Sequence, residues 1–262
     1  MFQPVLPFGG LSGWRFLQDT YDRQMETFTK SVELKRDSDY FDSKIADVEN
    51  AEDLVKDRRL LRVALGAFGL QDDIDNRYFI QKILEEGTLN DDSLANRFAD
   101  PKYAEFSKAF SFGPNEIRKT GDVNFPSQII EKFQANSFEV ATGEQDSNMR
   151  ISLYAAREMA ELAKDEGSID TKWFTIMGDP PLRNVFEKAL NLPEAFGQID
   201  IDQQLGVFKE RAKKKFGTDD PSIFSDAGKL DNLITTFIVR EQVSNLNSSL
   251  SPGSIALTLL QS

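Results

Sequence analysis

The sequence predicts an all-α, multihelical protein built from two pseudo-repeated helical units joined by a helical hairpin. Apolar residues recur at steps of three and four through most of the 262 residues, and this is the spacing of one face of an α-helix. Asp, Ser and Asp-Pro pairs precede these stretches and Gly residues follow them, as at helix ends. No convincing pair of strands appears, and 40% hydrophobic residues are enough to fill a core.

The N-terminal stretch predicts a long amphipathic helix over residues 12–32. One face of it carries Trp14, Leu17, Tyr21, Met25 and Phe28 at helical spacing. A second helix is predicted over residues 38–48, with Ser38 as its cap.

The first repeated unit begins at Asp57, which precedes a strongly periodic helix closed by Gly69. A helix over residues 77–86 is predicted to end at Gly87. Asp91 or Asp92 then introduces a short helix, and the Asp-Pro pair at residues 100–101 starts another that ends at Gly113.

The second half begins after residues 114–126, which are predicted to form a surface connection. Two longer helices, over residues 127–141 and 148–167, are predicted to form an antiparallel hairpin. Further helices are then expected at the following places: after Asp170, after Asp179, from Asp200 to Phe216, over residues 227–250 and after Ser251.

An internal repeat relates the two halves of the chain. DRRLLRVALGAFGL from Asp57 and DPPLRNVFEKALNL from Asp179 share a cap, a Leu-Val-Ala stripe and a final Gly or Asn before Leu. We therefore expect a pseudo-duplicated helical domain. Its expected segments form one compact domain: residues 1–50 (amphipathic helices), 51–113 (first repeat), 114–169 (connection and hairpin) and 170–262 (second repeat and C-terminal helices).

Composition disfavours several classes of function. The net charge of -12 opposes binding to nucleic acid or to an anionic membrane surface. Without Cys or His the chain has no thiolate ligands and lacks the commonest acid–base and nucleophilic catalytic arrangements. No apolar stretch is long enough for a membrane span, and the first ten residues do not have the pattern of a cleavable signal peptide.

The acidic and glycine-rich segments are interpreted as structural. Asp72, Asp73 and Asp75 lack the Gly and Glu of a calcium loop and fit a helix start. Asp200 and Asp202 also open a helix, and the Gly9–Gly13 segment matches no phosphate-binding pattern. We therefore assign no catalytic, cofactor-binding or metal-binding residue.

Two apolar stripes remain as candidate interfaces. The first consists of Trp14, Phe16, Leu17, Tyr21 and Met25, and the second of Val239, Val243, Leu246 and Leu250. Each stripe either packs against the body of the chain or contacts another protein. Aromatic side chains such as Trp14 often anchor protein interfaces.

Five segments resemble an uncharacterised bacterial family, the domain of unknown function numbered 1217. They are GWRFLQDT, DYFDSKI, DRRLLRVALGAFGLQDDI, FTIMGDPPLR and IDIDQQL, at residues 13–20, 39–45, 57–74, 174–183 and 199–205. The resemblance implies a multihelical fold without assigned catalytic residues. It also implies an association with flagellar gene clusters, chiefly in alphaproteobacteria.

The resulting hypothesis is a non-enzymatic interaction or assembly factor linked to the bacterial flagellum, located in the cytoplasm or at the flagellum. Its partner would be an axial, basal-body or export component. The alternative is a cytoplasmic regulator or small-molecule-binding module with a ligand between the two halves. A carboxylate-based enzyme is the least favoured class, and the sequence does not indicate an oligomeric state.

Overall fold

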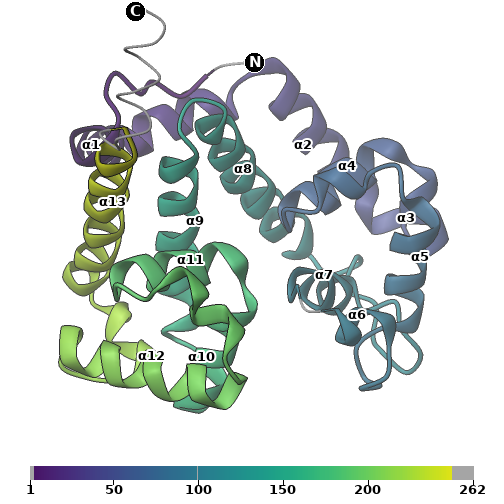
Figure 1. The fold of residues 1–262 in the computed structure, drawn as a ribbon. Coiled ribbons are helices and arrows are strands. Elements are labelled where there is room, and N and C mark those ends of the chain that lie inside the picture. Colours follow the sequence, from purple (N-terminus) through teal and green to yellow (C-terminus); the bar gives the residue numbers. More distant parts are fainter. Residues whose placement is uncertain (1–2, 99, 250–262) are drawn as a thin grey trace, which may run out of the picture. The chain divides into compact units, whose positions relative to one another are not determined.

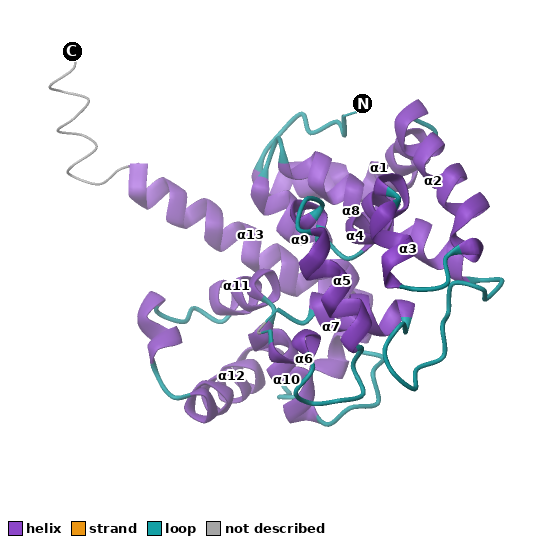
Figure 2. Ribbon diagram, turned by 90° about the vertical axis from the view of Figure 1, so that its right-hand side faces the viewer, coloured by secondary structure: helices purple, strands orange, loops and turns teal. Residues whose placement is uncertain are grey.

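The computed structural model describes residues 3–98 and 100–249 of the chain (Figure 1). Within these ranges the backbone forms thirteen α-helices, four short 3-10 helices and no strand (Figure 2). The all-α prediction is therefore confirmed. No helix in the described ranges combines the length and the apolar character that crossing a membrane requires.

The chain divides into two compact units. Unit 1 consists of residues Met1–Val5 and Asp19–Glu144, and unit 2 consists of Leu6–Gln18 and Gln145–Ser262. The first helix, α1 (Gly10–Thr29), contributes to both units. The division after Glu144 falls inside the segment 114–169 that was expected to hold the helical hairpin.

Unit 1 is organised around three helices that pack against one another, α2, α4 and α8. Rings from several elements fill its core: Phe28 and Tyr21 both meet Phe138 edge-on, with ring centroids 5.4 Å apart. The helices of this unit are α2 (Val32–Lys44), α3 (Ala51–Lys56), α4 (Arg58–Ala67), α5 (Arg77–Glu86), α6 (Leu94–Arg97), α7 (Lys102–Phe110) and α8 (Phe125–Gly143). The 3-10 helices η1 (Ile45–Asp47) and η2 (Gln71–Asp73) connect them.

The predicted boundary between the first two helices was wrong. α1 ends at Thr29 and α2 begins at Val32, with Ser31 as its N-cap residue in an extended conformation. Ser38 is not a cap, because it lies buried inside α2. The break between the helices allows Phe28 and Leu34 both to be buried. The spacing of apolar residues along a single helix does not reveal this requirement, because it depends on tertiary packing.

Unit 2 repeats the arrangement of three mutually packed helices with α9, α11 and α13. Trp173 lies at its centre, 5.3 Å from the ring of Phe186 and 5.6 Å from that of Phe208. Its indole Nε1 donates a hydrogen bond of 2.7 Å to the carbonyl oxygen of Asp219. The elements are α9 (Ser147–Leu162), α10 (Ile169–Gly178), α11 (Pro180–Ala189), η3 (Glu194–Gln198), α12 (Ile201–Phe216), η4 (Pro221–Ser225) and α13 (Ala227–Ser249).

The two related segments begin and end with the same local geometry. Asp57 caps α4 by accepting the amides of Arg59 and Leu60, and Asp179 caps α11 by accepting the amide of Leu182. After both helices the chain takes a positive φ, 71° at Gly69 and 57° at Asn191. The following Leu amide bonds back five residues in each case, as in a Schellman motif. These matches agree with the expected pseudo-duplication, which stays a prediction.

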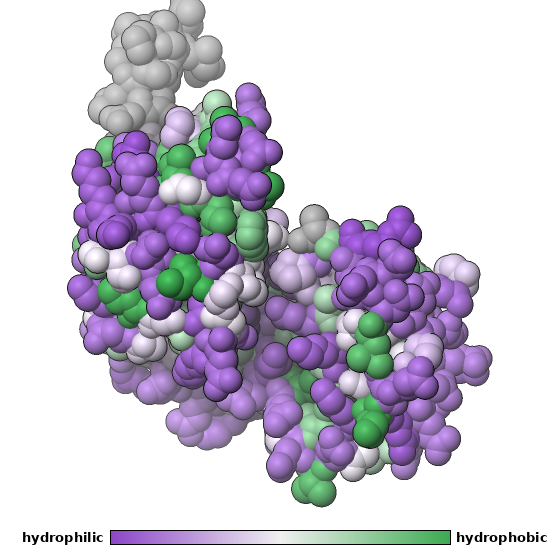
Figure 3. All heavy atoms as spheres, turned by 90° about the horizontal axis from the view of Figure 1, so that it is seen from below, coloured by the Kyte–Doolittle hydropathy of each residue, from purple (hydrophilic) through white to green (hydrophobic). Residues whose placement is uncertain are grey.

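The surface is mainly polar on the face that Figure 3 shows. Hydrophilic residues cover most of that face, with hydrophobic residues scattered among them (Figure 3). Scattered apolar residues are normal on a protein surface.

The predicted helix after Ser251 lies outside the described residues.

Candidate functional site

The beginning of α1 lies antiparallel beside α13 within unit 2. Arg15 Nη1 contacts Asp231 Oδ1 at 2.6 Å, and Arg15 Nη2 donates to Thr235 Oγ1 at 3.1 Å. The amide of Leu11 donates to Gln242 Oε1 at 3.3 Å, near the other end of the pair. The hydrogen bond from Arg15 holds the pKa of the Asp231 carboxyl below its ordinary value.

The five residues predicted for an interface on α1 divide into two groups. Trp14 and Leu17 are buried. These two side chains therefore pack in the core of the chain, which is the alternative to a partner contact that the sequence analysis gave. Phe16, Tyr21 and Met25 are half-buried. A contact between these three side chains and a partner stays a prediction.

The second predicted stripe, on α13, is exposed where the structure describes it. Val239 and Val243 expose 38% and 50% of their surface, whereas Phe237 and Ile238 are buried. Steps of four residues place both valines on the face that carries Thr235, which contacts α1. The side chains of Leu246 and Leu250 lie outside the described residues.

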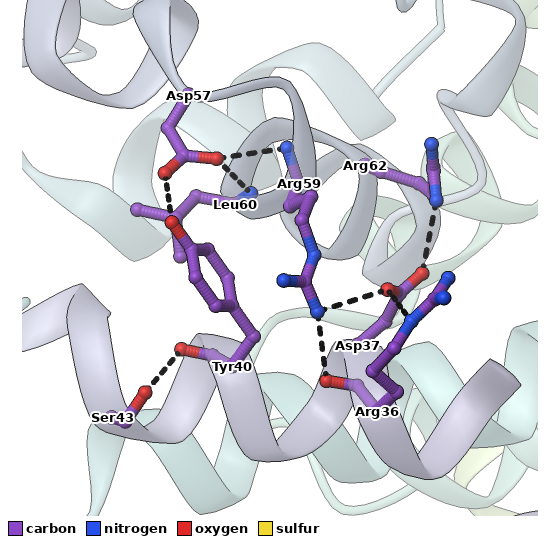
Figure 4. Close-up of polar contacts among 8 residues, drawn as sticks. All are labelled: Arg36, Asp37, Tyr40, Ser43, Asp57, Arg59, Leu60 and Arg62. Carbon is purple, nitrogen blue, oxygen red and sulfur yellow. Dashed lines mark hydrogen bonds and ion pairs between the residues drawn. The ribbon is translucent and has the colours of Figure 1, made fainter. Parts of the chain in front are cut away.

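A cluster of charged residues between α2 and α4 was not predicted (Figure 4). Asp37 is buried on α2, and its Oδ2 accepts a hydrogen bond of 3.1 Å from Arg62 Nη1. Its Oδ1 lies 3.6 Å from Arg59 Nη2 and 3.7 Å from Arg36 Nε. These two distances are too long for hydrogen bonds. Three guanidinium groups therefore surround one buried carboxylate.

Arg59 is fixed by a second set of contacts in the same region (Figure 4). Its guanidinium carbon lies 3.9 Å from the centroid of the Tyr40 ring, a cation–π contact. The Tyr40 hydroxyl donates to Asp57 Oδ2 at 2.7 Å. Burial raises the pKa of the Asp57 carboxyl, but the hydrogen bonds from Tyr40 and from the amides of α4 outweigh burial and lower it overall.

Unit 2 contains a second tyrosine–aspartate pair. The hydroxyl of Tyr154 donates to Asp179 Oδ2, and Asp179 Oδ1 accepts the amide of Leu182 at 2.9 Å. Burial, followed by the charge of Asp179, raises the pKa of Tyr154 far above its ordinary value. Such a phenol stays protonated, so this pair is a structural link between α9 and the cap of α11.

The acidic segments that resembled metal sites are engaged in local structure. Asp73 Oδ2 accepts a hydrogen bond from the Tyr103 hydroxyl at 2.8 Å, and Asp75 pairs with Arg58 at 2.6 Å. Asp200 caps α12. Among the described residues, no group of three or more carboxylates is arranged to hold a metal ion.

A pocket of about 470 Å³ opens beside α5 and α6. Glu85, Glu86 and Asp92 supply carboxylates to its lining. The hydrogen bond from Lys82 lowers the pKa of Glu85, and Glu86 accepts the amide of Leu94 at 2.7 Å. Two of these three carboxylates therefore have structural partners.

Comparisons with known proteins identify relatives without a described activity. A family model described as "Protein of unknown function (DUF1217)" matches residues 67–230. No curated protein sequence matches the chain. The crystal structure of protein AGR_C_984 from Agrobacterium tumefaciens is similar, with a TM-score of 0.70 and 24% sequence identity over 90% of this chain and 97% of that chain. At this identity, the similarity shows the fold alone.

Proposed function

The chain belongs to the DUF1217 family of proteins of unknown function, and we propose that it is a non-enzymatic interaction or assembly factor of the bacterial flagellum. The partner would be an axial, basal-body or export component that binds beside the paired helices α1 and α13. The observation that carries this proposal is the exposed stripe of Val239 and Val243.

The stripe has the properties of a helix-docking surface. It continues the α13 face on which Asp231 and Thr235 already contact α1. Two apolar side chains at this spacing match the i, i+4 anchors by which one amphipathic helix binds another. A partner helix placed along α13 would cover both valines.

The flagellar part of the proposal has a different basis. It follows from the association of the resembling family with flagellar gene clusters, which is a genomic argument and not a physical one. The non-enzymatic part is supported by the carboxylates and tyrosines described above, which cap helices or pair with neighbouring side chains.

A crosslinking pull-down from flagellated cells tests this proposal. The tagged full-length chain is compared with Val239→Glu/Val243→Glu, and captured proteins are identified by mass spectrometry. The matched control is Val32→Glu/Val123→Glu, which changes two valines that are 85% and 94% exposed in unit 1. We expect flagellar proteins to be captured by the wild type and the control, and to be lost with the α13 variant.

Point substitutions are preferable to removing α1, because Trp14, Leu17 and Phe28 are core residues. Equal capture by all three proteins would reject α13 as the interface. If the folded wild type captures no flagellar protein, the flagellar assignment fails.

A second candidate function, a small-molecule-binding module, is favoured by the pocket beside α5 and α6, which lies within unit 1 and not between the two halves, where the sequence analysis placed the ligand. Its volume lies in the range of small-molecule sites, and its carboxylates suit a cationic ligand. Thermal-shift assays with polyamines and basic amino acids test this regulator or ligand-binding alternative. A rise in melting temperature that Asp92→Asn abolishes would support it, and unchanged melting across the set would reject cationic ligands of these classes.

A further inference from the structure

We propose that Arg36, Arg59 and Arg62 form a docking site for an acidic segment of a partner protein, with Asp37 holding the three guanidinium groups together. The three side chains converge on Asp37 from α2 and α4 (Figure 4). This surface belongs to unit 1 and is separate from the α13 stripe. It therefore goes beyond the proposed function and shares with it only the presence of a protein partner.

The cluster carries more positive charge than its own structure requires. One arginine is enough to pair with one buried carboxylate, yet three surround Asp37. If Asp57, which interacts with Arg59, is also counted, the cations still outnumber the anions by three to two. This local surplus lies in a chain with a net charge of -12.

Two neighbouring pairs of opposite charges do not cancel the surplus, because the members of each pair contact each other. Arg58 pairs with Asp75 at 2.6 Å, and Lys35 pairs with Asp39 at 2.7 Å. Each of these pairs is neutral as a whole. These two pairs therefore leave the surplus of the cluster unchanged.

The three guanidinium groups are accessible, and those of Arg59 and Arg62 are held by hydrogen bonds. The side chains of Arg36, Arg59 and Arg62 are 61%, 38% and 44% exposed. Arg59 is stacked on Tyr40 and donates to the carbonyl oxygen of Arg36 at 3.1 Å. Each guanidinium has five N–H donors, and the hydrogen bonds to the Arg36 carbonyl and to Asp37 use only one donor each of Arg59 and Arg62. Donors that are already oriented lose less entropy when a ligand binds.

The buried carboxylate is itself incompletely satisfied. Among the described residues, Asp37 Oδ1 has no hydrogen-bond partner, although it lies within 3.7 Å of two guanidinium groups. Asp37 therefore acts as an anchor that attracts the arginines while it occupies one of their donors, Arg62 Nη1. The free donors point to an external acceptor.

The chemistry of the cluster fits carboxylates on a short protein segment. Guanidinium groups bind carboxylates through two parallel hydrogen bonds, and clusters of arginine recognise acidic motifs in proteins. A long polyanion such as nucleic acid would meet the overall negative charge of the chain beyond the cluster. A segment with one or two carboxylates at the contact matches the surplus of one or two positive charges.

A peptide titration tests this site directly. A fluorescein-labelled peptide with four consecutive glutamates, and a matched peptide with four glutamines, are titrated with the full chain at low salt and followed by fluorescence anisotropy. We expect the glutamate peptide to bind at least about tenfold more tightly. Each exposed ion pair contributes up to about fivefold in affinity, so Arg36→Gln/Arg62→Gln should weaken binding roughly 5- to 25-fold.

Two controls keep the result interpretable. Arg36→Gln alone removes a side chain that makes no hydrogen bond within the described residues, so it should fold normally and still weaken binding. Arg23→Gln/Arg77→Gln removes the same charge from exposed positions on α1 and α5, and should change affinity by less than about twofold. Circular dichroism verifies the fold of each variant.

Three outcomes would overturn the proposal. They are equal binding of the two peptides, equal weakening by the control pair, and tighter binding of a labelled single-stranded oligonucleotide that responds to the same arginine variants. The titration uses no flagellar protein. Its failure is therefore distinguishable from failure of the pull-down.

Discussion

Replacing Asp179 by alanine should destabilise unit 2 through two separate losses. The carboxylate caps α11 by accepting the amide of Leu182 at 2.9 Å, and it also accepts the hydroxyl of Tyr154. Asp179 is buried, so water does not readily replace it at either contact. Both interactions disappear in Asp179→Ala.

The size of the effect follows from these contacts. Loss of an N-cap side chain costs about 1 kcal/mol. Removing the acceptor of a half-buried hydroxyl costs about 1–2 kcal/mol more. We therefore expect Asp179→Ala to lower the free energy of unfolding by about 2–3 kcal/mol. Tyr154→Phe keeps the cap, removes the hydroxyl that Asp179 accepts, and should cost about 1–2 kcal/mol.

The assay is guanidinium denaturation followed by tryptophan fluorescence. Both tryptophans of the chain, Trp14 and Trp173, belong to unit 2, and the Trp173 ring lies 5.3 Å from that of Phe186 on α11. The fluorescence transition therefore reports on the unit that contains the mutated cap.

A double-mutant cycle gives the decisive comparison. In the Asp179→Ala background, Tyr154→Phe should cost little, because its acceptor is already absent, which corresponds to a coupling of about 1–2 kcal/mol. Asp57→Ala is the matched substitution in unit 1. It removes a cap and the acceptor of the Tyr40 hydroxyl, and should cost about 1–2 kcal/mol by circular dichroism, less than Asp179→Ala because Asp57 is only half-buried. Additive losses in the cycle, or a smaller loss for Asp179→Ala than for Asp57→Ala, would refute the reasoning.

Three further predictions concern backbone strain and pH. Gly87→Ala should cost about 1–3 kcal/mol in a denaturant titration, because Gly87 has φ 66° and ψ -158° and an added Cβ would lie 2.7 Å from the Cα of Gly113; an unchanged midpoint would contradict this. Burial and a hydrogen bond raise the pKa of Tyr103 from 10.0 to about 12. The contribution of this side chain to the free energy of unfolding is therefore complete below pH 10 and is lost as the pH rises towards 12. The urea midpoint of Tyr103→Phe should fall less over this pH interval than that of the wild type. The hydrogen bond from Arg15 lowers the pKa of Asp231. The contribution of this carboxylate to the free energy of unfolding is therefore present above the ordinary pKa of 3.8 and is lost as the pH falls below it. Asp231→Asn should be less stable than the wild type at pH 6 and lose less stability between pH 5 and pH 2.5, and equal losses in the two proteins would exclude this linkage.

The local features of the fold could be predicted because their causes are local. Asp57 and Asp179 cap helices as expected, and Gly69 and Gly87 end them with positive φ. Each of these positions is decided by a residue and its neighbours within one turn. The helix break at Ser31 was missed, because it depends on where Phe28 and Leu34 are buried.

The candidate sites depend on contacts between distant residues, and sequence spacing does not reveal these. Arg15 and Asp231 are 216 residues apart, so no periodicity pairs α1 with α13. The arginine cluster carried a weak signal, because Arg59 and Arg62 share a helix face at i, i+3. Its centre could not be identified, since nothing local distinguishes the buried Asp37 from its exposed neighbour Asp39.

The membership of α1 in both units has a consequence for the order of folding on the ribosome. Residues 6–18 belong to unit 2, but the intervening residues 19–144 are synthesised before the rest of that unit. At about 5–20 residues per second, these 126 residues take roughly 6–25 s. Throughout that time Trp14 and Leu17 have no unit 2 partners from residue 145 onwards, so the nascent chain presents an apolar segment that chaperones would bind. A circular permutant that places residues 6–18 after the end of α13 should shorten this exposure.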